Sequence, residues 1–470
     1  MTAAFDIAVI GGGSGGLTVA AAAARFGRRV VLFEKGPMGG DCLNFGCVPS
    51  KALIAAARQA EALREAGPYG IRAQEPDIDF AKVNDHVHRV IAAIEPNDSA
   101  ARFATLGVTV VQAEARFRDS STIEAAGQAF TARRMVIASG SRPAVPPIPG
   151  LSEVPYFTNE TLFDNRQRPG HLVIVGGGPI GLEMAQAHRR LGARVTVIEA
   201  NDPLSKDDPE LVAVVLAKLG EEGIAIMART PVTAVRGTST GIAVDIGGGG
   251  TVDGTHLLLA TGRVPNIEGL NLEAAGIAAT RRGITVDRGL RTTNRRVYAI
   301  GDVAGGAQFT HAAAYHAGLV IRSALFGLPV RANAVIPWVT FTEPELAQAG
   351  LTESQARAIH GDAVSVVTWP FHDNDRAQAE GRTAGLVKAV IGRRGRILGA
   401  GIAGAQAGDL LQPWILAIGN GLKLPAIANM MVPYPTRGEA SRRAAVAAYA
   451  GLADNRWVRG AISVVSRLIK

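Results

Sequence analysis

One glycine pattern occurs twice in this chain, each time directly after a short apolar run. The shared form is Gly-x-Gly-x-x-Gly, and the two sets are Gly11, Gly13, Gly16 and Gly176, Gly178, Gly181. A second apolar run follows each set and ends in an acidic residue, Glu34 in the first repeat and Glu199 in the second. Glycines let a backbone approach a pyrophosphate at a helix N-terminus, and the carboxylate can accept from a ribose hydroxyl. The repeat therefore predicts two strand–turn–helix–strand units and two bound dinucleotides.

The only cysteines among 470 residues, Cys42 and Cys47, lie shortly after the first repeat. Pro49 and an Ala-rich run over residues 51–66 predict a helix that begins near the proline. The positive end of that helix favours thiolate over thiol. Because five residues of regular helix rise roughly 7.5 Å, a bond between the two sulfurs needs a distorted turn, which Gly46 permits. We interpret the two thiols as a redox pair, and two buried, unreactive cysteines are the alternative.

Composition and charge exclude several classes of protein. The chain is rich in Gly and poor in aromatic residues, which is typical of nucleotide-binding α/β proteins. The formal charge of +8 is spread along the sequence without a basic cluster interleaved with aromatics, so we expect no nucleic-acid binding and a surface that attracts anionic cofactors. No secretory signal pattern and no uncharged run that could span a bilayer are present, and we expect a cytoplasmic protein.

The order of patterns predicts three domains. The expected borders are 1–150 with a return at 264–335, then 151–263, then 336–470. A Pro-rich segment from Ser139 to Gly150 is interpreted as the crossing between the first two. The last domain is expected to be α+β, with strands near 364–368, 384–391 and 397–402 and helices near 353–359 and 408–419.

Together these features resemble the group I flavoprotein disulfide reductases, which include glutathione reductase, dihydrolipoamide dehydrogenase and mercuric reductase. The resemblance is carried by both glycine repeats, the redox motif at 39–51, and the segments 260–266, 301–302 and 341–345. It implies an α/β fold of two Rossmann-like dinucleotide-binding domains plus a C-terminal α+β dimerisation domain. It also implies an FAD-dependent NAD(P)H oxidoreductase that works as a homodimer.

The resemblance assigns FAD to the first repeat. Glu34 would contact the adenosine ribose, Asp302 the ribityl–pyrophosphate region, and the helix starting near Thr310 would point at the flavin. The residues expected around FAD are Gly11, Gly13, Gly16, Glu34, Lys35, Gly40, Asp41, Lys51, Ser139, Gly140, Gly301, Asp302, Thr310 and His311. His311 could equally be a packed polar residue.

The second repeat would bind the nicotinamide nucleotide. The expected residues are Gly176, Gly178, Gly181, Glu183, Glu199 and Gly262. Glu199 favours NADH because a carboxylate repels a 2′-phosphate, while Arg194 keeps NADPH possible. Lys51 would lie near flavin N5 and pair with Glu183, and an ordinary surface ion pair is the alternative.

As the family works, electrons pass from NAD(P)H through FAD to a disulfide between Cys42 and Cys47. Cys47 would be the thiolate in contact with the flavin, and Cys42 would attack the acceptor. No resident metal site is expected.

The chain departs from its disulfide-reducing relatives near its C-terminus. Those relatives use a His from the partner subunit as general acid–base, with a Glu five residues later. Tyr434 stands at the His position here, while Glu439 is kept. A phenol is a poor base at neutral pH, so reduction of a disulfide should be slow. Tyr434 packed against the partner chain is the alternative.

This departure predicts a mercuric-reductase-like enzyme whose acceptor is a thiophilic metal ion or a small oxidant, such as a quinone or a reactive chlorine species. The additional C-terminal cysteine pair of mercuric reductases is missing, since the chain has only two cysteines. A dihydrolipoamide-dehydrogenase-type enzyme is the alternative, and Glu199 supports it. An NAD(H)-responsive redox sensor with little turnover is the alternative from another class.

The tail from Trp457 to Lys470 predicts a basic amphipathic helix. One face would hold Trp457, Ala461, Val464, Val465 and Leu468, and the other Arg459, Ser463, Ser466 and Lys470. We expect this helix to pack on the body or on the dimer, and contact with an anionic membrane surface is the alternative.

Overall fold

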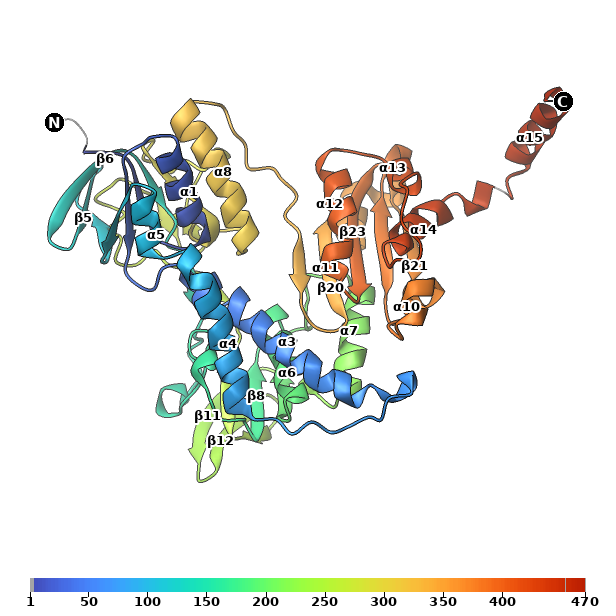
Figure 1. The fold of residues 1–470 in the computed structure, drawn as a ribbon, viewed down its shortest axis with the longest axis horizontal. Helices are drawn as coiled ribbons and strands as arrows, with labels where there is room; N and C mark the ends of the chain where they lie inside the picture. The colour runs from blue at the N-terminus through green and yellow to red at the C-terminus, as the bar shows by residue number, and fades with distance from the viewer. Residues whose placement is uncertain (1–3, 453, 470) are drawn as a thin grey trace. The chain divides into compact units, whose positions relative to one another are not determined.

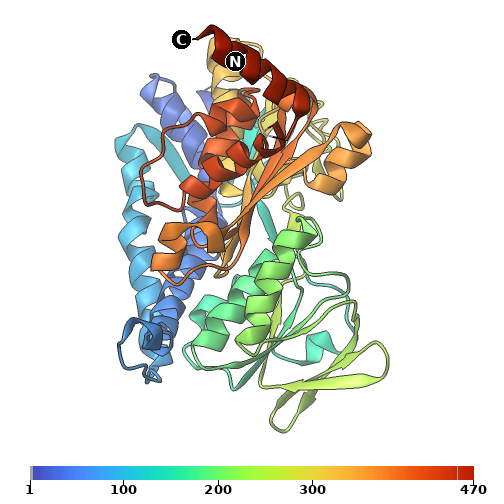
Figure 2. The same cartoon turned by 90° about the vertical axis from the view of Figure 1, so that its right-hand side faces the viewer.

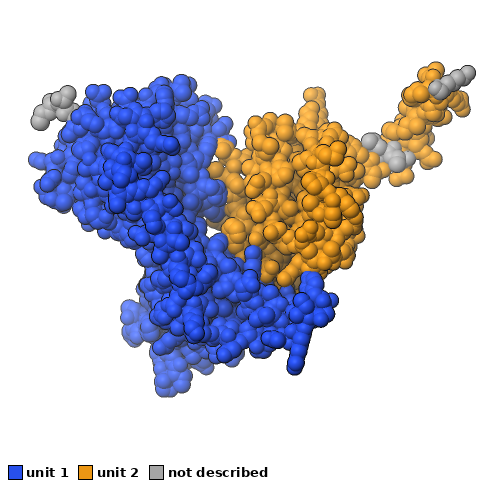
Figure 3. Space-filling view, viewed as in Figure 1, with its two compact units in different colours: residues 1–201, 224–333 blue, residues 202–223, 334–470 orange. Residues whose placement is uncertain are grey.

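The computed structural model describes residues 4–452 and 454–469, and the chain forms two compact units (Figures 1 and 3). Unit 1 comprises residues 1–201 and 224–333, and unit 2 comprises residues 202–223 and 334–470. Helix α7 (Pro209–Glu221) thus belongs to the C-terminal unit, although it lies mid-sequence. The domain borders expected at 150, 263 and 335 stay predictions.

A seven-stranded sheet is the centre of the first glycine repeat. Its order is β3-β2-β1-β6-β5-β4, with β18 also paired to β6. The strands are β1 (Phe5–Ile10), β2 (Val30–Glu34), β3 (Val108–Gln112), β4 (Ala115–Phe117), β5 (Thr122–Ala125), β6 (Gln128–Ile137) and β18 (Val297–Ala299). β1 is parallel to β2 and to β6, whereas β5 is antiparallel to β6.

Both faces of this sheet are covered, which explains why its central strands are apolar throughout. Ile7 and Val9 of β1 pack in one core with α1 (Ser14–Arg25) and α8 (Thr310–Phe326). Ala8 and Ile10 face the opposite core. Helix α1 connects β1 to β2, so the predicted strand–turn–helix–strand unit is present.

The second glycine repeat forms the same unit on a four-stranded parallel sheet. Its order is β10-β9-β8-β14, with β8 (His171–Val175), β9 (Arg194–Ile198), β10 (Ala225–Met227) and β14 (His256–Leu259). Helix α6 (Pro179–Arg190) connects β8 to β9. An antiparallel sheet of β11 (Val232–Thr238), β12 (Gly241–Ile246) and β13 (Gly250–Gly254) shares its core.

Two short strands connect the repeats within unit 1. β7 (Ser141–Pro143) is antiparallel to β15 (Arg263–Pro265). This pairing brings the Pro-rich segment next to the segment 260–266. Each of the two segments follows an apolar strand, β6 and β14 respectively.

The redox cysteines lie on two consecutive helices, α2 (Gly40–Asn44) and α3 (Cys47–Arg64). Helix α3 packs against α4 (Phe80–Ile94) and α6 (Figures 1 and 2). The expected start near Pro49 was wrong, because Ser50 N already donates to Gly46 O at 3.1 Å and closes the first turn. Pro49 is tolerated there since N–H groups of a first turn have no helical partner. Cys47 is therefore the first residue of α3.

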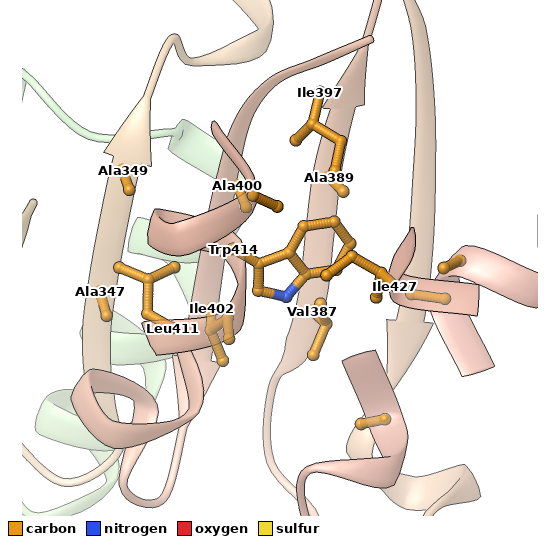
Figure 4. Packing of buried hydrophobic residues seen from close by; sticks show 14 of the residues in the cluster. Ala347, Ala349, Val387, Ala389, Ile397, Ala400, Ile402, Leu411, Trp414 and Ile427 are labelled. Atoms are coloured by element: carbon orange, nitrogen blue, oxygen red, sulfur yellow. The ribbon is translucent and has the colours of Figure 1, made fainter. Parts of the chain in front are cut away.

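Unit 2 is built on a five-stranded antiparallel sheet of order β19-β20-β23-β22-β21. The strands are β19 (Trp338–Thr340), β20 (Glu345–Gly350), β21 (Ser365–Pro370), β22 (Leu386–Ile391) and β23 (Ile397–Gly404). Its core surrounds the buried Trp414, against Ala400, Ile402 and Val387 of the central strands (Figure 4). The indole Nε1 donates to Ser441 Oγ at 3.0 Å, which satisfies its one buried polar group.

The helices of unit 2 are mostly short. Besides α7 they are α9 (Glu353–His360), α10 (Asp375–Ala379), α11 (Ala407–Leu410), α12 (Gln412–Gly419), α13 (Leu424–Ala428), α14 (Glu439–Ala447) and α15 (Arg456–Leu468). The single helix expected over 408–419 was wrong. Pro413 has no N–H to continue the hydrogen-bond ladder, and the chain forms two helices with Leu411 between them.

Helix α15 confirms the helical tail, and Lys470 lies outside the described residues. Across residues 4–452 and 454–469, none of the helices combines the length and apolar character needed to cross a membrane.

Candidate functional site

The first and third glycines of both repeats are required by close backbone contacts. Gly11 and Gly176 have φ values of 109° and 116°, and an added Cβ would lie 2.3 Å from the carbonyl oxygen of Ala138 or Ala260 respectively. At the third position, a Cβ on Gly16 would lie 1.9 Å from Gly11 O, and a Cβ on Gly181 would lie 2.0 Å from Gly176 O. These glycines keep the turn tight and the helix close to its strand.

The middle glycines serve a different purpose. A Cβ on Gly178 would meet nothing within 4 Å, and one on Gly13 would meet only Gly40 Cα at 3.9 Å. The N-cap residues of α1 and α6 are Gly13 and Gly178, which have no side chain with which to cap the helix. Each turn thus leaves a space in front of a helix N-terminus, where the positive end of the helix dipole favours a pyrophosphate. The residues of both repeats fit a bound dinucleotide.

The acidic residues that end β2 and β9 are held identically in the two repeats. Glu34 accepts from Gly12 N at 2.6 Å and from Gly36 N at 2.7 Å. Glu199 accepts from Gly177 N at 2.6 Å and from Asn201 N at 2.8 Å. Both carboxylates are therefore fixed beside the glycine turn, a position that fits an acceptor for a ribose hydroxyl.

The two cysteines lie next to each other and next to the start of α8. Both are free in this structure, and the redox-active disulfide that the resemblance implies stays a prediction. Cys47 Sγ lies 3.6 Å from Thr310 Oγ1. A hydrogen bond from Cys42 lowers the pKa of Cys47 to about 6, with further help from Thr310 and the charge of Lys51 against the opposing effect of burial. The same contact with Cys47, followed by burial, raises the pKa of Cys42. These contacts favour the thiolate at Cys47 and the thiol at Cys42.

Lys51 and Glu183 form a short ion pair across unit 1. Lys51 Nζ lies 2.7 Å from Glu183 Oε2, and only 5% of the Glu183 side chain is exposed. An ordinary surface pair does not fit this burial. Lys51 is one turn after Cys47 on α3, so the pair fixes a cation beside the thiolate.

A polar network that sequence reasoning missed connects the redox turn to Asp302. Arg263 Nη2 lies 3.1 Å from Asp41 Oδ1, and Arg263 Nε donates to Ser141 Oγ at 2.8 Å. Ser141 Oγ in turn donates to Asp302 Oδ2 at 2.5 Å. Asn159 Nδ2 also donates to Asp41, at 3.0 Å. Burial raises the pKa of Asp302, against the effect of the Ser141 hydrogen bond. Arg263 could have been suspected from the sequence, because it lies in the segment 260–266 that carries part of the family resemblance.

Other predicted residues contribute backbone shape. Gly40, Gly140, Gly262 and Gly301 all have positive φ. Ser139 Oγ donates to Asn266 O at 2.8 Å and fixes the crossing segment. His311 stacks on Phe309 with ring centroids 5.2 Å apart. Lys35 pairs with Glu114 at 3.4 Å on the surface, and its expected role beside FAD stays a prediction.

Tyr434 and Glu439 belong to unit 2, whereas the cysteines belong to unit 1. Tyr434 Oη donates to Asp375 Oδ2 at 2.7 Å, and 67% of the tyrosine is exposed. The hydrogen bond and the charge of Asp375 raise the pKa of Tyr434. Glu439 Oε1 accepts from Arg443 Nε at 2.9 Å. The phenol therefore stays protonated at neutral pH, with its proton directed at a carboxylate.

No cluster of three or more His, Cys, Asp or Glu side chains that could hold a metal ion occurs within the part of the chain that the structure describes.

A family model described as pyridine nucleotide-disulphide oxidoreductase matches residues 5–317. The chain belongs to this family. A second model, the dimerisation domain of the pyridine nucleotide-disulphide oxidoreductases, matches residues 336–445 and supports a homodimer.

Individual relatives cover almost the whole chain. A mercuric reductase from Streptomyces lividans is 38% identical over 453 residues, which is 94% of this chain and 95% of that protein. A dihydrolipoyl dehydrogenase from Geobacillus stearothermophilus is 35% identical over 459 residues, covering 93% and 94% respectively. A solved Cu(II) complex of the HOCl-induced flavoprotein disulfide reductase RclA from Escherichia coli has 28% identity and a TM-score of 0.85, over 93% of this chain and 99% of that one.

The expected family, fold class and enzyme class are thereby confirmed. Pyridine nucleotide-disulphide oxidoreductases are enzymes that use FAD and a pyridine nucleotide. The assignment of one glycine repeat to each of them stays a prediction. The protein is an FAD-dependent NAD(P)H oxidoreductase.

Proposed function

We propose that this oxidoreductase transfers electrons from NADH through FAD and the Cys42–Cys47 pair to a thiophilic metal ion, as mercuric reductases do. One observation carries the proposal: the position of the family's acid–base His holds Tyr434, whose proton is directed at Asp375. A disulfide acceptor needs a proton for its leaving thiolate, whereas a soft metal ion does not. The likeness to a mercuric reductase and to a disulfide reductase solved with Cu(II) supports the same acceptor class.

The electron balance fits such an acceptor. Oxidation of NADH to NAD⁺ and a proton releases two electrons, which reduce one Hg(II) to Hg(0) or two Cu(II) to Cu(I). Soft cations select thiolate ligands. Cys42 and Cys47 supply two adjacent sulfurs, one already ionised at neutral pH.

FAD, when bound, supplies the carrier between the nicotinamide and the thiols. The chain's own residues prepare the thiol side. Lys51 and Thr310 stabilise the Cys47 thiolate, and Glu183 fixes the position of Lys51. Cys42 keeps its proton until it engages the acceptor. We infer that Tyr434 and Glu439 complete the site across the homodimer, and the cytoplasm remains the expected location.

NADH is the proposed donor because the Glu199 carboxylate, held by two backbone N–H groups at the end of β9, fits an acceptor for a ribose hydroxyl. A 2′-phosphate would meet that negative charge. The proposal predicts a markedly lower Kd for NAD⁺ than for NADP⁺, measured by calorimetry.

The decisive experiment compares Hg(II), Cu(II), lipoamide and a quinone as acceptors, in wild type and in Tyr434→His. We expect metal-dependent NADH oxidation in the wild type and slow lipoamide reduction. Tyr434→His should raise lipoamide turnover at least 10-fold without raising metal turnover, because a positioned general acid contributes about 10²–10⁴-fold.

Two results would redirect the assignment. Rapid lipoamide reduction by the wild type without metal turnover would favour the dihydrolipoamide-dehydrogenase type, which Glu199 and the relative from Geobacillus also support. Flavin reduction by NADH without turnover of any acceptor would favour the redox sensor.

A further inference from the structure

The C-terminal helix α15 separates apolar and basic side chains completely onto two faces. At 100° per residue, Trp457, Val458, Ala461, Ile462, Val464, Val465, Leu468 and Ile469 fall on one side. The remaining positions of the helix hold Arg456, Arg459, Gly460, Ser463, Ser466 and Arg467. Between residues 456 and 469 there are three arginines and no acidic residue.

The apolar face of α15 is not covered by the described chain. No residue of α15 is buried, and Trp457 and Leu468 are 76% and 78% exposed. Isolated exposed apolar residues are ordinary, but a continuous apolar helix face marks an interaction surface.

The helix is encoded locally and lies beyond the family's common architecture. The side chain of Asn455 accepts from Trp457 N and Val458 N, which gives α15 its own N-cap. The match to the dimerisation domain ends at residue 445, before α15 begins. Helix α15 therefore lies outside the residues that the dimerisation-domain model matches.

We propose that α15 binds the surface of an anionic lipid bilayer and lies in the plane of the interface. Its composition fits this occupant, because a basic-only polar face meets lipid phosphates while the apolar face enters the acyl boundary. Trp457 has Arg456 over its ring at 5.4 Å, and amphipathic aromatic rings favour the headgroup level. Thirteen helical residues rise roughly 20 Å, too short for a hydrocarbon core of about 30 Å, so the helix binds and does not span.

Sedimentation of the full-length holoenzyme with vesicles tests the proposal. The probes are vesicles of phosphatidylcholine alone and vesicles with 30% phosphatidylglycerol, each at about 0.1 M and 0.5 M salt. We expect binding to the anionic vesicles, at least 10-fold weaker binding to the neutral ones, and a loss at high salt because exposed charges are screened.

Two neighbouring substitutions give a charge-matched comparison. Val465→Asp places a carboxylate in the apolar face, whereas Ser466→Asp adds the same charge to the polar face. Val465→Asp should abolish vesicle binding, while Ser466→Asp should weaken it only about 5-fold. Neither residue belongs to the redox site, so NADH oxidation without vesicles should be unchanged in both.

Absence of wild-type binding to anionic vesicles would overturn the proposal. Equal loss in the two variants would also overturn it, since the apolar face would then contribute nothing. A smaller particle by light scattering in Val465→Asp alone, with no lipid binding by the wild type, would identify a second copy of the chain as the occupant. These outcomes do not depend on the electron acceptor.

Discussion

The two sulfurs of the redox turn are chemically inequivalent because one donates a hydrogen bond and the other accepts it. Cys42 donates to Cys47, which favours the thiolate at Cys47 and the thiol at Cys42. Thr310 and Lys51 add a second donor and a positive charge at Cys47. The sequence places both cysteines near a helix start, whereas the contact with Thr310 comes from α8, more than 250 residues later.

Removal of the Thr310 hydroxyl tests this inequivalence. In Thr310→Val the pKa of Cys47 should rise from about 6 by about one unit, because a hydrogen bond to a charged group contributes about 1.5–3 kcal/mol. Since the folded value is depressed, the thiolate is present above it and lost below it. The rate of Cys47 alkylation by iodoacetamide across pH 5–9, followed by mass spectrometry on the reduced protein, measures the inflection.

Thr310→Ser is the matched control, because it keeps the hydroxyl while removing only a methyl group. Its inflection should stay near that of the wild type. A profile in Thr310→Val that coincides with the Thr310→Ser profile would show that the threonine does not set the pKa of Cys47.

At the scale of the elements, the second and third glycines of each repeat have different roles. The third allows close packing of the helix on its strand, and the second leaves space in front of the helix N-terminus. Gly181→Ala should destabilise the protein by about 3 kcal/mol, because the new Cβ would lie 2.0 Å from Gly176 O. Gly178→Ala should leave the thermal midpoint unchanged, because its Cβ meets nothing within 4 Å. It should instead weaken NAD⁺ binding at least 10-fold, by filling the space for the pyrophosphate. Calorimetry measures both quantities.

If Gly178→Ala bound NAD⁺ as tightly as wild type, the space in front of α6 would not be the pyrophosphate site. The corresponding positions Gly13 and Gly16 allow the same comparison at the first repeat, with FAD as the proposed ligand.

Much of the element-level architecture follows from local patterns. Both βαβ units could be predicted from glycine spacing, since the glycines, the flanking apolar runs and the final acidic residue recur at the same spacing in both repeats. The start of α3 at Cys47 and the break between α11 and α12 could not, because they depend on which N–H groups find partners around Pro49 and Pro413. The contacts among Asp41, Asn159, Arg263 and Asp302 also escaped, because no periodicity records a side chain meeting one over 100 residues away.

At the scale of the whole molecule, one buried cation ties the segment 202–223 to the C-terminal residues of unit 2. Lys388 of β22 lies 3.0 Å from Asp208, 2.9 Å from Glu210 and 2.9 Å from Glu353, and only 7% of its side chain is exposed. Burial alone would lower the pKa of Lys388, but the three hydrogen bonds outweigh it and raise that pKa. The lysine is therefore charged and paired inside unit 2.

Lys388→Met should destabilise unit 2 by about 3 kcal/mol, because it leaves the buried Asp208 without its cation. Tryptophan fluorescence during urea unfolding reports on the unfolding of unit 2, since all four tryptophans, at positions 338, 369, 414 and 457, lie in this unit. Lys423→Met makes the same replacement at an exposed position of this unit and should change stability by less than about 0.5 kcal/mol.

The pH dependence of this difference separates an ion pair from simple loss of packing. A raised lysine pKa contributes stability that is present below its ordinary value of about 10.4 and is lost as pH rises through the folded value. The pKa of Glu353 is lowered by its hydrogen bond to Lys388, so that contribution is lost as pH falls below the ordinary glutamate value of about 4.3. The gap in unfolding free energy between wild type and Lys388→Met should therefore be flat from about pH 6 to 9 and shrink on both sides. A gap independent of pH from 3 to 11 would mean that the methylene stem of Lys388, and not its charge, stabilises unit 2.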